Sequence, residues 1–280
     1  MKRVFPLIFL LISVFFTPAR GFFLTAIQEK GQGFALKGEE VFWILFRSEP
    51  FQGVIYDLKA PKAYVILPSQ KKEPVALRRT KVFDYAKGQK RYAWVAHYLP
   101  TIEGDHFLVL ETDPTLVPRV NEVWKEYVKI PLHVAFGRAW EKELLLPAEI
   151  VFLSQPYGLE EGALLRGKVI FQRKPLPQVL VQAVAYHGCY LETKDLPHNA
   201  FGRVEASRMY QNFFTDENGI FTVAFPHAGW WLISARIPSG NYKLGELTYP
   251  FFLRASVWIY VFPRFKVPEK APLLKIDPYK

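Results

Sequence analysis

Cysteine is almost absent from this chain, since Cys189 is the only one among 280 residues. A single thiol cannot form an intramolecular disulfide, so the fold must rest on its hydrophobic core even in an oxidising compartment. Methionine is also scarce, with 2 residues, whereas 22 prolines and 16% aromatic residues are more typical of strands and turns than of helical bundles. The composition therefore excludes a disulfide-stapled fold and favours an all-β protein.

Common catalytic motifs are also missing. The sequence contains no Gly-x-Ser-x-Gly, no His-Glu-x-x-His, no Walker loop and no Gly-x-Gly-x-x-Gly after a strand. Glu160 and Glu161 are adjacent carboxylates, but adjacency does not establish the separation that glycosidase chemistry needs. We predict that the protein is not an enzyme, although an active site assembled from distant residues would leave no such motif.

The first 21 residues have the pattern of a secretory signal peptide. Residues 1–3 are Met-Lys-Arg, residues 4–16 form an apolar run, and residues 17–21 include small residues at cleavage-like spacing. An uncleaved anchor is the alternative, but the apolar run is shorter than the roughly 20 residues that span a bilayer. We predict an exported, periplasmic protein that is cleaved after Ala19 or Gly21.

Basic residues outnumber acidic ones, 36 against 26, which gives a formal charge of +10. Cleavage after Gly21 removes Lys2, Arg3 and Arg20, so the mature protein is still basic. The basic residues are densest over 71–91. This stretch suits an anionic surface or an acidic partner, or it is simply a solvated hairpin. Nucleic acid is not an expected partner of an exported chain.

Alternating apolar runs separated by turn residues predict β-strands along the mature chain. The predicted strands cover 41–47, 63–67, 91–99, 106–112, 148–153, 164–172, 178–186, 219–225, 230–237 and 256–262. Their spacing is typical of β-sandwiches, and a break near residue 155 separates two groups. We predict a signal peptide over 1–21, an N-terminal sandwich over 22–155, a C-terminal sandwich over 156–263 and a tail over 264–280.

The second group of strands has the more specific turn pattern. Asn218-Gly219 precedes an alternating strand and predicts a tight turn with positive φ. Pro175 and Pro177 bound another turn, because proline cannot continue a ladder. The order of these elements resembles a transthyretin-like or carboxypeptidase-regulatory sandwich, a Greek-key relative of the immunoglobulin fold.

A more specific resemblance covers nearly the whole mature chain. The segments that carry it are 149–162, 167–186 and 215–235, together with 46–58, 103–112 and 123–137 in the first half. They resemble a domain-of-unknown-function family found in periplasmic components of cobalt and nickel uptake systems of the energy-coupling-factor type. The resemblance implies an exported, non-catalytic accessory protein that works with a membrane metal permease complex and handles Ni²⁺ or Co²⁺.

This chain departs from the histidines that the resemblance implies. They would lie soon after the signal peptide, before the Pro-Phe of 46–58 and before the Tyr of 123–137. The corresponding places hold Arg20-Gly21-Phe22, Glu49 and Glu126. Imidazole is a good nickel ligand, whereas carboxylate suits harder ions, so the substitutions should shift or abolish a site there.

A separate group of potential ligands lies in the long connection after residue 186. It contains His187, Cys189, Glu192, Asp195 and His198. Thiolate and imidazole bind borderline cations, although this spacing matches no standard zinc pattern. We predict His187, Cys189 and His198 as metal ligands, with Asp195 as a further candidate. The alternative is a solvated loop with a semi-buried cysteine.

The remaining histidines, His97, His106, His133 and His227, are interpreted as half-buried side chains with hydrogen-bond partners. Two further functions remain open. An aromatic platform would favour a carbohydrate- or protein-binding module, and its candidates are Trp230, Trp231, Tyr190 and Tyr210. The alternative for the adjacent tryptophans is that they are split across the sheet, with one in the core and one outside. A structural module of an envelope assembly would use a strand edge or residues 71–91.

Overall fold

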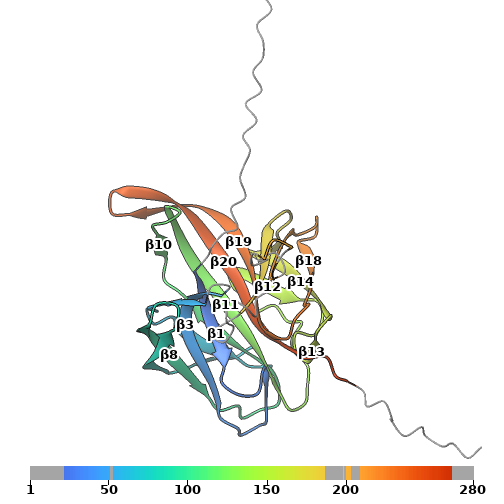
Figure 1. Ribbon diagram of the computed structural model, residues 1–280. Coiled ribbons are helices and arrows are strands. Elements are labelled where there is room, and N and C mark those ends of the chain that lie inside the picture. Colours follow the sequence, from blue (N-terminus) through green and yellow to red (C-terminus); the bar gives the residue numbers. More distant parts are fainter. Residues whose placement is uncertain (1–21, 51–52, 187–197, 199, 203–208, 267–280) are drawn as a thin grey trace, which may run out of the picture.

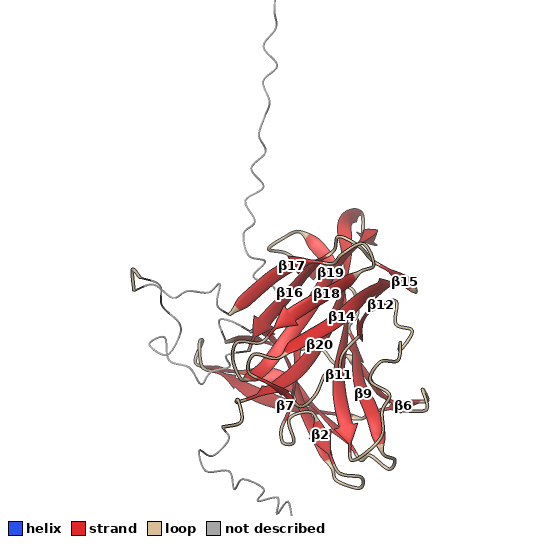
Figure 2. Ribbon diagram, turned by 90° about the vertical axis from the view of Figure 1, so that its right-hand side faces the viewer, coloured by secondary structure: helices blue, strands red, loops and turns tan. Residues whose placement is uncertain are grey.

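The computed structural model describes residues 22–50, 53–186, 198, 200–202 and 209–266. Within these residues the chain forms strands, turns and loops, and it contains no helix (Figure 2). The predicted all-β fold class is therefore confirmed. No helix in this described part could cross a membrane.

The described strands form three sheets. The five-stranded sheet has the order β1 (Phe23–Gln28), β3 (Val41–Glu49), β8 (Gln89–Tyr98), β7 (Leu77–Asp84), with β4 (Val54–Tyr56) also on β3. The four-stranded sheet contains β12 (Ala148–Phe152), β14 (Leu164–Phe171) and β15 (Lys174–Pro175) in order, with β18 (Ile220–Ala224) on β14.

The largest sheet has eleven strands. Its main order is β17 (Tyr210–Phe214), β16 (Leu180–Ala185), β19 (Gly229–Leu244), β20 (Leu247–Phe262), β11 (Glu122–Val134), β9 (Gly104–Glu111), β5 (Lys62–Ile66), β6 (Lys72–Pro74). Three short strands join it: β2 (Phe34–Ala35) and β10 (Thr115–Val117) on β11, and β13 (Leu159–Glu160) on β20.

The eleven-stranded sheet lies between the other two, so both of its faces are buried (Figure 1). On β9, Phe107 and Val109 belong to the core shared with the four-stranded sheet, whereas Leu108 and Leu110 belong to the core shared with the five-stranded sheet. Successive side chains of a strand point to opposite faces, so burial on both faces requires an unbroken apolar run. The sequence FLVL over 107–110 meets that requirement.

A buried ion pair joins the central sheet to the four-stranded sheet. Lys129 on β11 lies 2.9 Å from Glu149 on β12, between the rings of Phe107 and Phe152. The backbone N–H of Leu144 donates to the same carboxylate at 3.0 Å. Burial lowers the pKa of Lys129, although Glu149 opposes that shift. The pair aligns the layers with its charges compensated.

The two halves of the chain share the central sheet. β12 precedes residue 155 but pairs with β14, and β11 pairs in parallel with β20, from Val123 opposite Phe251 to Lys129 opposite Val257. The sequence pattern missed this connection because it reports local alternation and not strand order. The domain division at 155 and the transthyretin-like assignment stay predictions, which limited proteolysis and the stability of the separate halves would test.

The last two strands are longer than the apolar pattern predicts. β19 and β20 extend the predicted 230–237 and 256–262 into a hairpin arm that projects from the body of the molecule (Figure 1). The residues of this arm are mostly exposed, so no core imposes apolar alternation on them. Backbone pairing extends to Leu244 opposite Leu247.

The turn before β18 confirms the Asn-Gly prediction. Gly219 has φ +72° and its N–H donates to the carbonyl of Asp216 at 3.0 Å. A Cβ at Gly219 would lie 2.8 Å from the backbone nitrogen of Leu176. Both the positive φ and this close approach require glycine.

Candidate functional site

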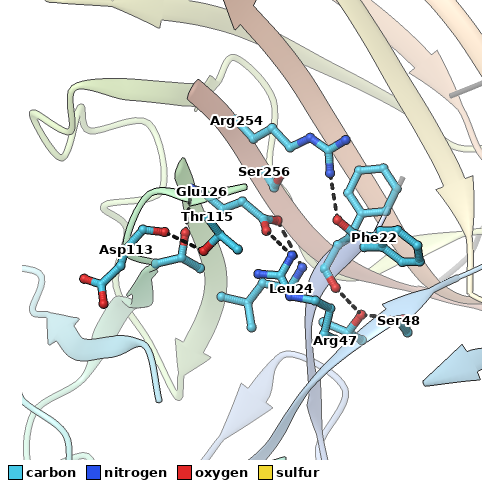
Figure 3. A network of polar contacts seen from close by, with 12 residues as sticks. Phe22, Leu24, Arg47, Ser48, Asp113, Thr115, Glu126, Arg254 and Ser256 are labelled. Carbon is cyan, nitrogen blue, oxygen red and sulfur yellow. Dashed lines mark hydrogen bonds and ion pairs between the residues drawn. The ribbon is translucent and has the colours of Figure 1, made fainter. Parts of the chain in front are cut away.

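The positions at which the resemblance implies histidines lie close together in the fold. Phe22 precedes β1, and the next residue, Phe23, pairs with Ser48, beside Glu49 on β3. The backbone N–H of Leu24 donates to Glu126 on β11 at 3.0 Å (Figure 3). Tyr56 connects the group, because its ring packs 4.4 Å from that of Phe22 and its pKa is raised by burial and then by Glu49.

Two arginines accompany the buried carboxylate of Glu126. Arg47 on β3 forms a 2.9 Å ion pair with it. Arg254 on β20 donates to the carbonyl of Phe22 at 2.9 Å, and its guanidinium lies 3.7 Å from the ring centroid of Trp124 (Figure 3). Burial lowers the pKa of Arg254 to about 10, with Glu126 opposing the shift, so the guanidinium is protonated at neutral pH.

This arrangement anchors the start of β1 to β3, β11 and β20. A divalent cation at Glu126 would meet the positive charges of Arg47 and Arg254, so this carboxylate serves an internal ion pair. Across the described residues, no group of three or more His, Cys, Asp or Glu side chains could hold a metal ion.

The predicted metal ligands belong to the connection between β16 and β17 and not to the group around Glu126. His187, Cys189, Glu192 and Asp195 lie outside the described residues, whereas His198 is described and exposed.

The candidates for the aromatic platform differ in burial, and Trp231 is not part of any exposed surface. Trp231 is fully buried against the four-stranded sheet, and Trp230 packs against the core on the opposite face of β19. Tyr210 is half-buried, and Tyr190 lies outside the described residues. The adjacent tryptophans are therefore split across the sheet, with Trp231 inside one core and Trp230 half-buried against the other.

Among the strand histidines, His106 is buried and bonded on both nitrogens. The hydroxyl of Tyr98 lies 2.9 Å from Nδ1 and the carbonyl of Ile102 lies 3.0 Å from Nε2. Nε2 must donate to that carbonyl, so Nδ1 of the neutral ring accepts from Tyr98. Burial lowers the pKa of His106 despite opposing effects of the Ile102 bond and nearby carboxylates. His97, in contrast, is exposed and lies 3.2 Å from Glu40.

His133 differs from these because a buried carboxylate orients it at the molecular surface. Asp105 on β9 lies opposite His133 on β11 in the strand register, and Oδ1 is 2.7 Å from Nδ1. Oδ2 accepts from the backbone N–H groups of Ala139 and Trp140 at 2.6 and 2.9 Å. The carboxylate therefore accepts from Nδ1–H of His133, and in the neutral imidazole this tautomer leaves Nε2 as an acceptor.

Tyr157 completes the surroundings of Asp105. Burial raises the pKa of its phenol, and the charge of Asp105 and a hydrogen bond to it raise that pKa further. Its ring stacks on His133 at 4.3 Å. A pocket of about 420 Å³ opens here, lined by His133, Tyr157, Phe136, Arg138, Trp140 and Gln155 among others. Sequence reasoning missed this site because Asp105 and His133 meet only through the pairing of β9 with β11.

Comparison with known protein families gives one match. A family model described as "Domain of unknown function (DUF4198)" matches residues 32–239. No curated protein matches the sequence.

Three of the solved structures that match this chain are compared with it by their identity, coverage and TM-score. The D0-D1 domain of intimin is 12% identical, with a TM-score of 0.23, over 85% of this chain and 97% of that chain. Trypsin-activated alpha-2-macroglobulin from Escherichia coli is 13% identical, with a TM-score of 0.24, over 86% of this chain but only 16% of that chain. An adhesin of Yersinia pseudotuberculosis is 10% identical, with a TM-score of 0.22, over 89% of this chain and 65% of that chain. The all-β assignment rests on the strand pairing of this chain itself.

Proposed function

Because the chain belongs to the DUF4198 family, whose description assigns no function, we propose that it is an exported, non-enzymatic accessory component of a nickel or cobalt uptake system. The observation that carries the proposal is the convergence of Phe22, Glu49 and Glu126 at one place in the fold. These are the positions at which the resemblance implies ligands, so their proximity supports a shared architecture.

The proposal places no metal at Glu126. The ion pair with Arg47 and the neighbouring Arg254 already compensate this carboxylate, and buried charges tolerate no additional cation without a further anion. Metal contact is instead assigned to His187, Cys189 and His198, whose imidazole and thiolate groups suit Ni²⁺ and Co²⁺. The partner is a membrane metal permease complex, and the protein acts by binding rather than by catalysis.

Calorimetric titration of the reduced, secreted protein with NiCl₂ and CoCl₂ tests the ligands. We expect a dissociation constant below about 1 mM, corresponding to roughly 4 kcal/mol of standard free energy. The triple variant His187→Ala, His198→Ala, Cys189→Ser should lose this binding. His97→Ala, which removes an exposed histidine from β8, is the matched control and should bind as the parent does. Equal binding by the triple variant would refute the ligand assignment.

The accessory role needs a cellular measurement. Cells that lack the gene should take up less radioactive Ni²⁺ or Co²⁺ at limiting concentration, and the secreted protein should restore uptake. N-terminal sequencing should find the mature chain beginning at Arg20 or Phe22. Unchanged uptake in the deletion strain would contradict the accessory role, whatever the calorimetry shows.

A second function is favoured by the pocket beside His133. An envelope module that binds a carbohydrate or protein, with no metal role, would need a solvent-accessible pocket with convergent polar groups and aromatic walls. The pocket lined by His133, Trp140 and Tyr157 has these features.

A further inference from the structure

The ring of His133, which lines the pocket beside it, is held in one orientation by several contacts. Asp105 is buried, and its Oδ1 accepts a hydrogen bond from Nδ1–H of His133 while its Oδ2 accepts from two backbone N–H groups. The ring of His133 is also held by stacking on Tyr157 and by an edge contact with Phe34. These contacts fix the position of Nε2, which is an acceptor in the neutral ring, in a side chain that lines the pocket.

The loop after β11 presents an aromatic side chain to solvent at the same pocket. Phe136 is 77% exposed and lies between Ala135, with φ +52°, and Gly137, with φ +103°. A left-handed conformation costs energy at a non-glycine residue and persists where the surroundings enforce it. Gly137 allows the loop to approach β9, because a Cβ there would lie 3.1 Å from Cα of Gly104.

The polar groups that line the pocket offer hydrogen bonds, and the lining residue with a permanent charge, Arg138, has a carboxylate partner. Arg138 lies 3.3 Å from Glu141, and both oxygens of Asp105 behind His133 are engaged in hydrogen bonds. Gln155 uses one N–H for the carbonyl of Tyr157 at 3.0 Å, which leaves its second N–H and its carbonyl oxygen for a ligand. An ionic ligand would therefore gain little here, whereas a neutral ligand rich in hydroxyl groups could both donate and accept.

We propose that this pocket binds a pyranose unit of a neutral saccharide. A sugar ring combines apolar C–H faces, which pack on aromatic rings, with hydroxyl groups at its edge. Phe136 supplies an exposed aromatic surface and Nε2 of His133 accepts from a hydroxyl. Gln155 and Arg138, whose guanidinium lies 5.0 Å from the ring centroid of Trp140, donate to others. The volume of about 420 Å³ lies within the range of small-molecule sites.

This inference rests on the second of the proposed functions and requires no metal. Its test is calorimetric titration of the full secreted chain with maltotriose, cellotriose and chitotriose in a buffer containing a chelator. We expect at least one of them to bind with a dissociation constant below about 1 mM. The titration with NiCl₂ and CoCl₂ uses the same protein but tests a different set of residues. The saccharide proposal and the metal proposal can therefore fail independently of each other.

Two variants locate the binding. Phe136→Ser changes an exposed side chain, and His133→Ala removes the acceptor while the backbone donors to Asp105 remain. Each should weaken binding at least tenfold. Leu247→Ser, at 62% exposure on the distant β19–β20 hairpin, is the matched control and should bind like the parent. The proposal would be overturned if none of the three saccharides bound to the parent protein. It would also be overturned if Phe136→Ser and His133→Ala each bound the saccharide as tightly as the parent does.

Discussion

Two buried carboxylates on neighbouring strands of the central sheet have different surroundings. Glu126 on β11 and Asp105 on β9 are each 1% exposed, and each is fully engaged in hydrogen bonds or ion pairs. The partners of Glu126 are Arg47 and the backbone of β1, which lie inside the fold. Asp105 instead holds a histidine that lines a pocket. Burial and saturation alone therefore do not distinguish a structural carboxylate from one that prepares a binding surface.

Replacing Glu126 by alanine should have the largest effect on stability. It leaves Arg47 and Arg254 near each other without the carboxylate that compensates them, and breaking a buried pair typically costs about 3–5 kcal/mol. Urea denaturation followed by tryptophan fluorescence measures the loss. Glu246→Ala, at the exposed turn of the β19–β20 hairpin, should stay within about 0.5 kcal/mol of the parent. If Glu126→Ala lowered the free energy of unfolding by less than about 1 kcal/mol, the ion pair with Arg47 would contribute no more than an exposed surface pair does.

Asp105→Asn should cost less stability but abolish saccharide binding. The amide keeps one acceptor oxygen and the shape of the side chain, but its NH₂ group faces either His133 or the backbone donors of residues 139 and 140. One such mismatch costs about 1–3 kcal/mol. The same denaturation experiment and the saccharide titration measure both effects. Unchanged saccharide binding would show that the orientation of His133 has no role in the pocket.

His106, next to Asp105 on β9, should make stability depend on pH. Burial lowers its folded-state pKa below the ordinary value of 6.5, so the unfolded chain takes up the proton first as the pH falls. Its contribution is complete above pH 6.5 and decreases as the pH falls toward the lowered folded value. His106→Gln should therefore lose less stability than the parent between pH 7.5 and 5.5 in urea denaturation. An equal loss in both proteins would assign the pH dependence to other groups.

Phe136→Ser should have the smallest effect on stability, within about 0.5 kcal/mol, because the side chain is mostly in solvent. Thermal unfolding by circular dichroism checks this. Phe136→Ser therefore tests saccharide binding near Asp105 without a change in folding stability. A substitution of Glu126 cannot do this, because that carboxylate is part of a buried ion pair. A pronounced loss of stability would mean that Phe136 packs onto the body of the protein in solution.

Local patterns predicted much of the fold. The strands at 41–49, 104–111 and 164–171 follow from alternating or continuous apolar residues, and the turn at Gly219 follows from Asn-Gly. The β19–β20 arm was missed because exposed strands carry no apolar pattern. The burial of one member of the Trp230–Trp231 pair follows from strand alternation, but the packing of Trp230 against a second core does not, because the sequence does not show that both faces of β19 are covered.

The sequence by itself determined an all-β chain without a possible internal disulfide, because strand alternation, turn residues and cysteine number are local or compositional properties. Only the tertiary structure decided that one sheet serves two cores, that Arg47 and Arg254 accompany Glu126, and that Asp105 orients His133. Each of these contacts joins strands that are far apart in the chain and adjacent only through sheet order and layer packing. Side-chain alternation specifies which face a residue occupies, but it does not specify which strand or sheet that face meets.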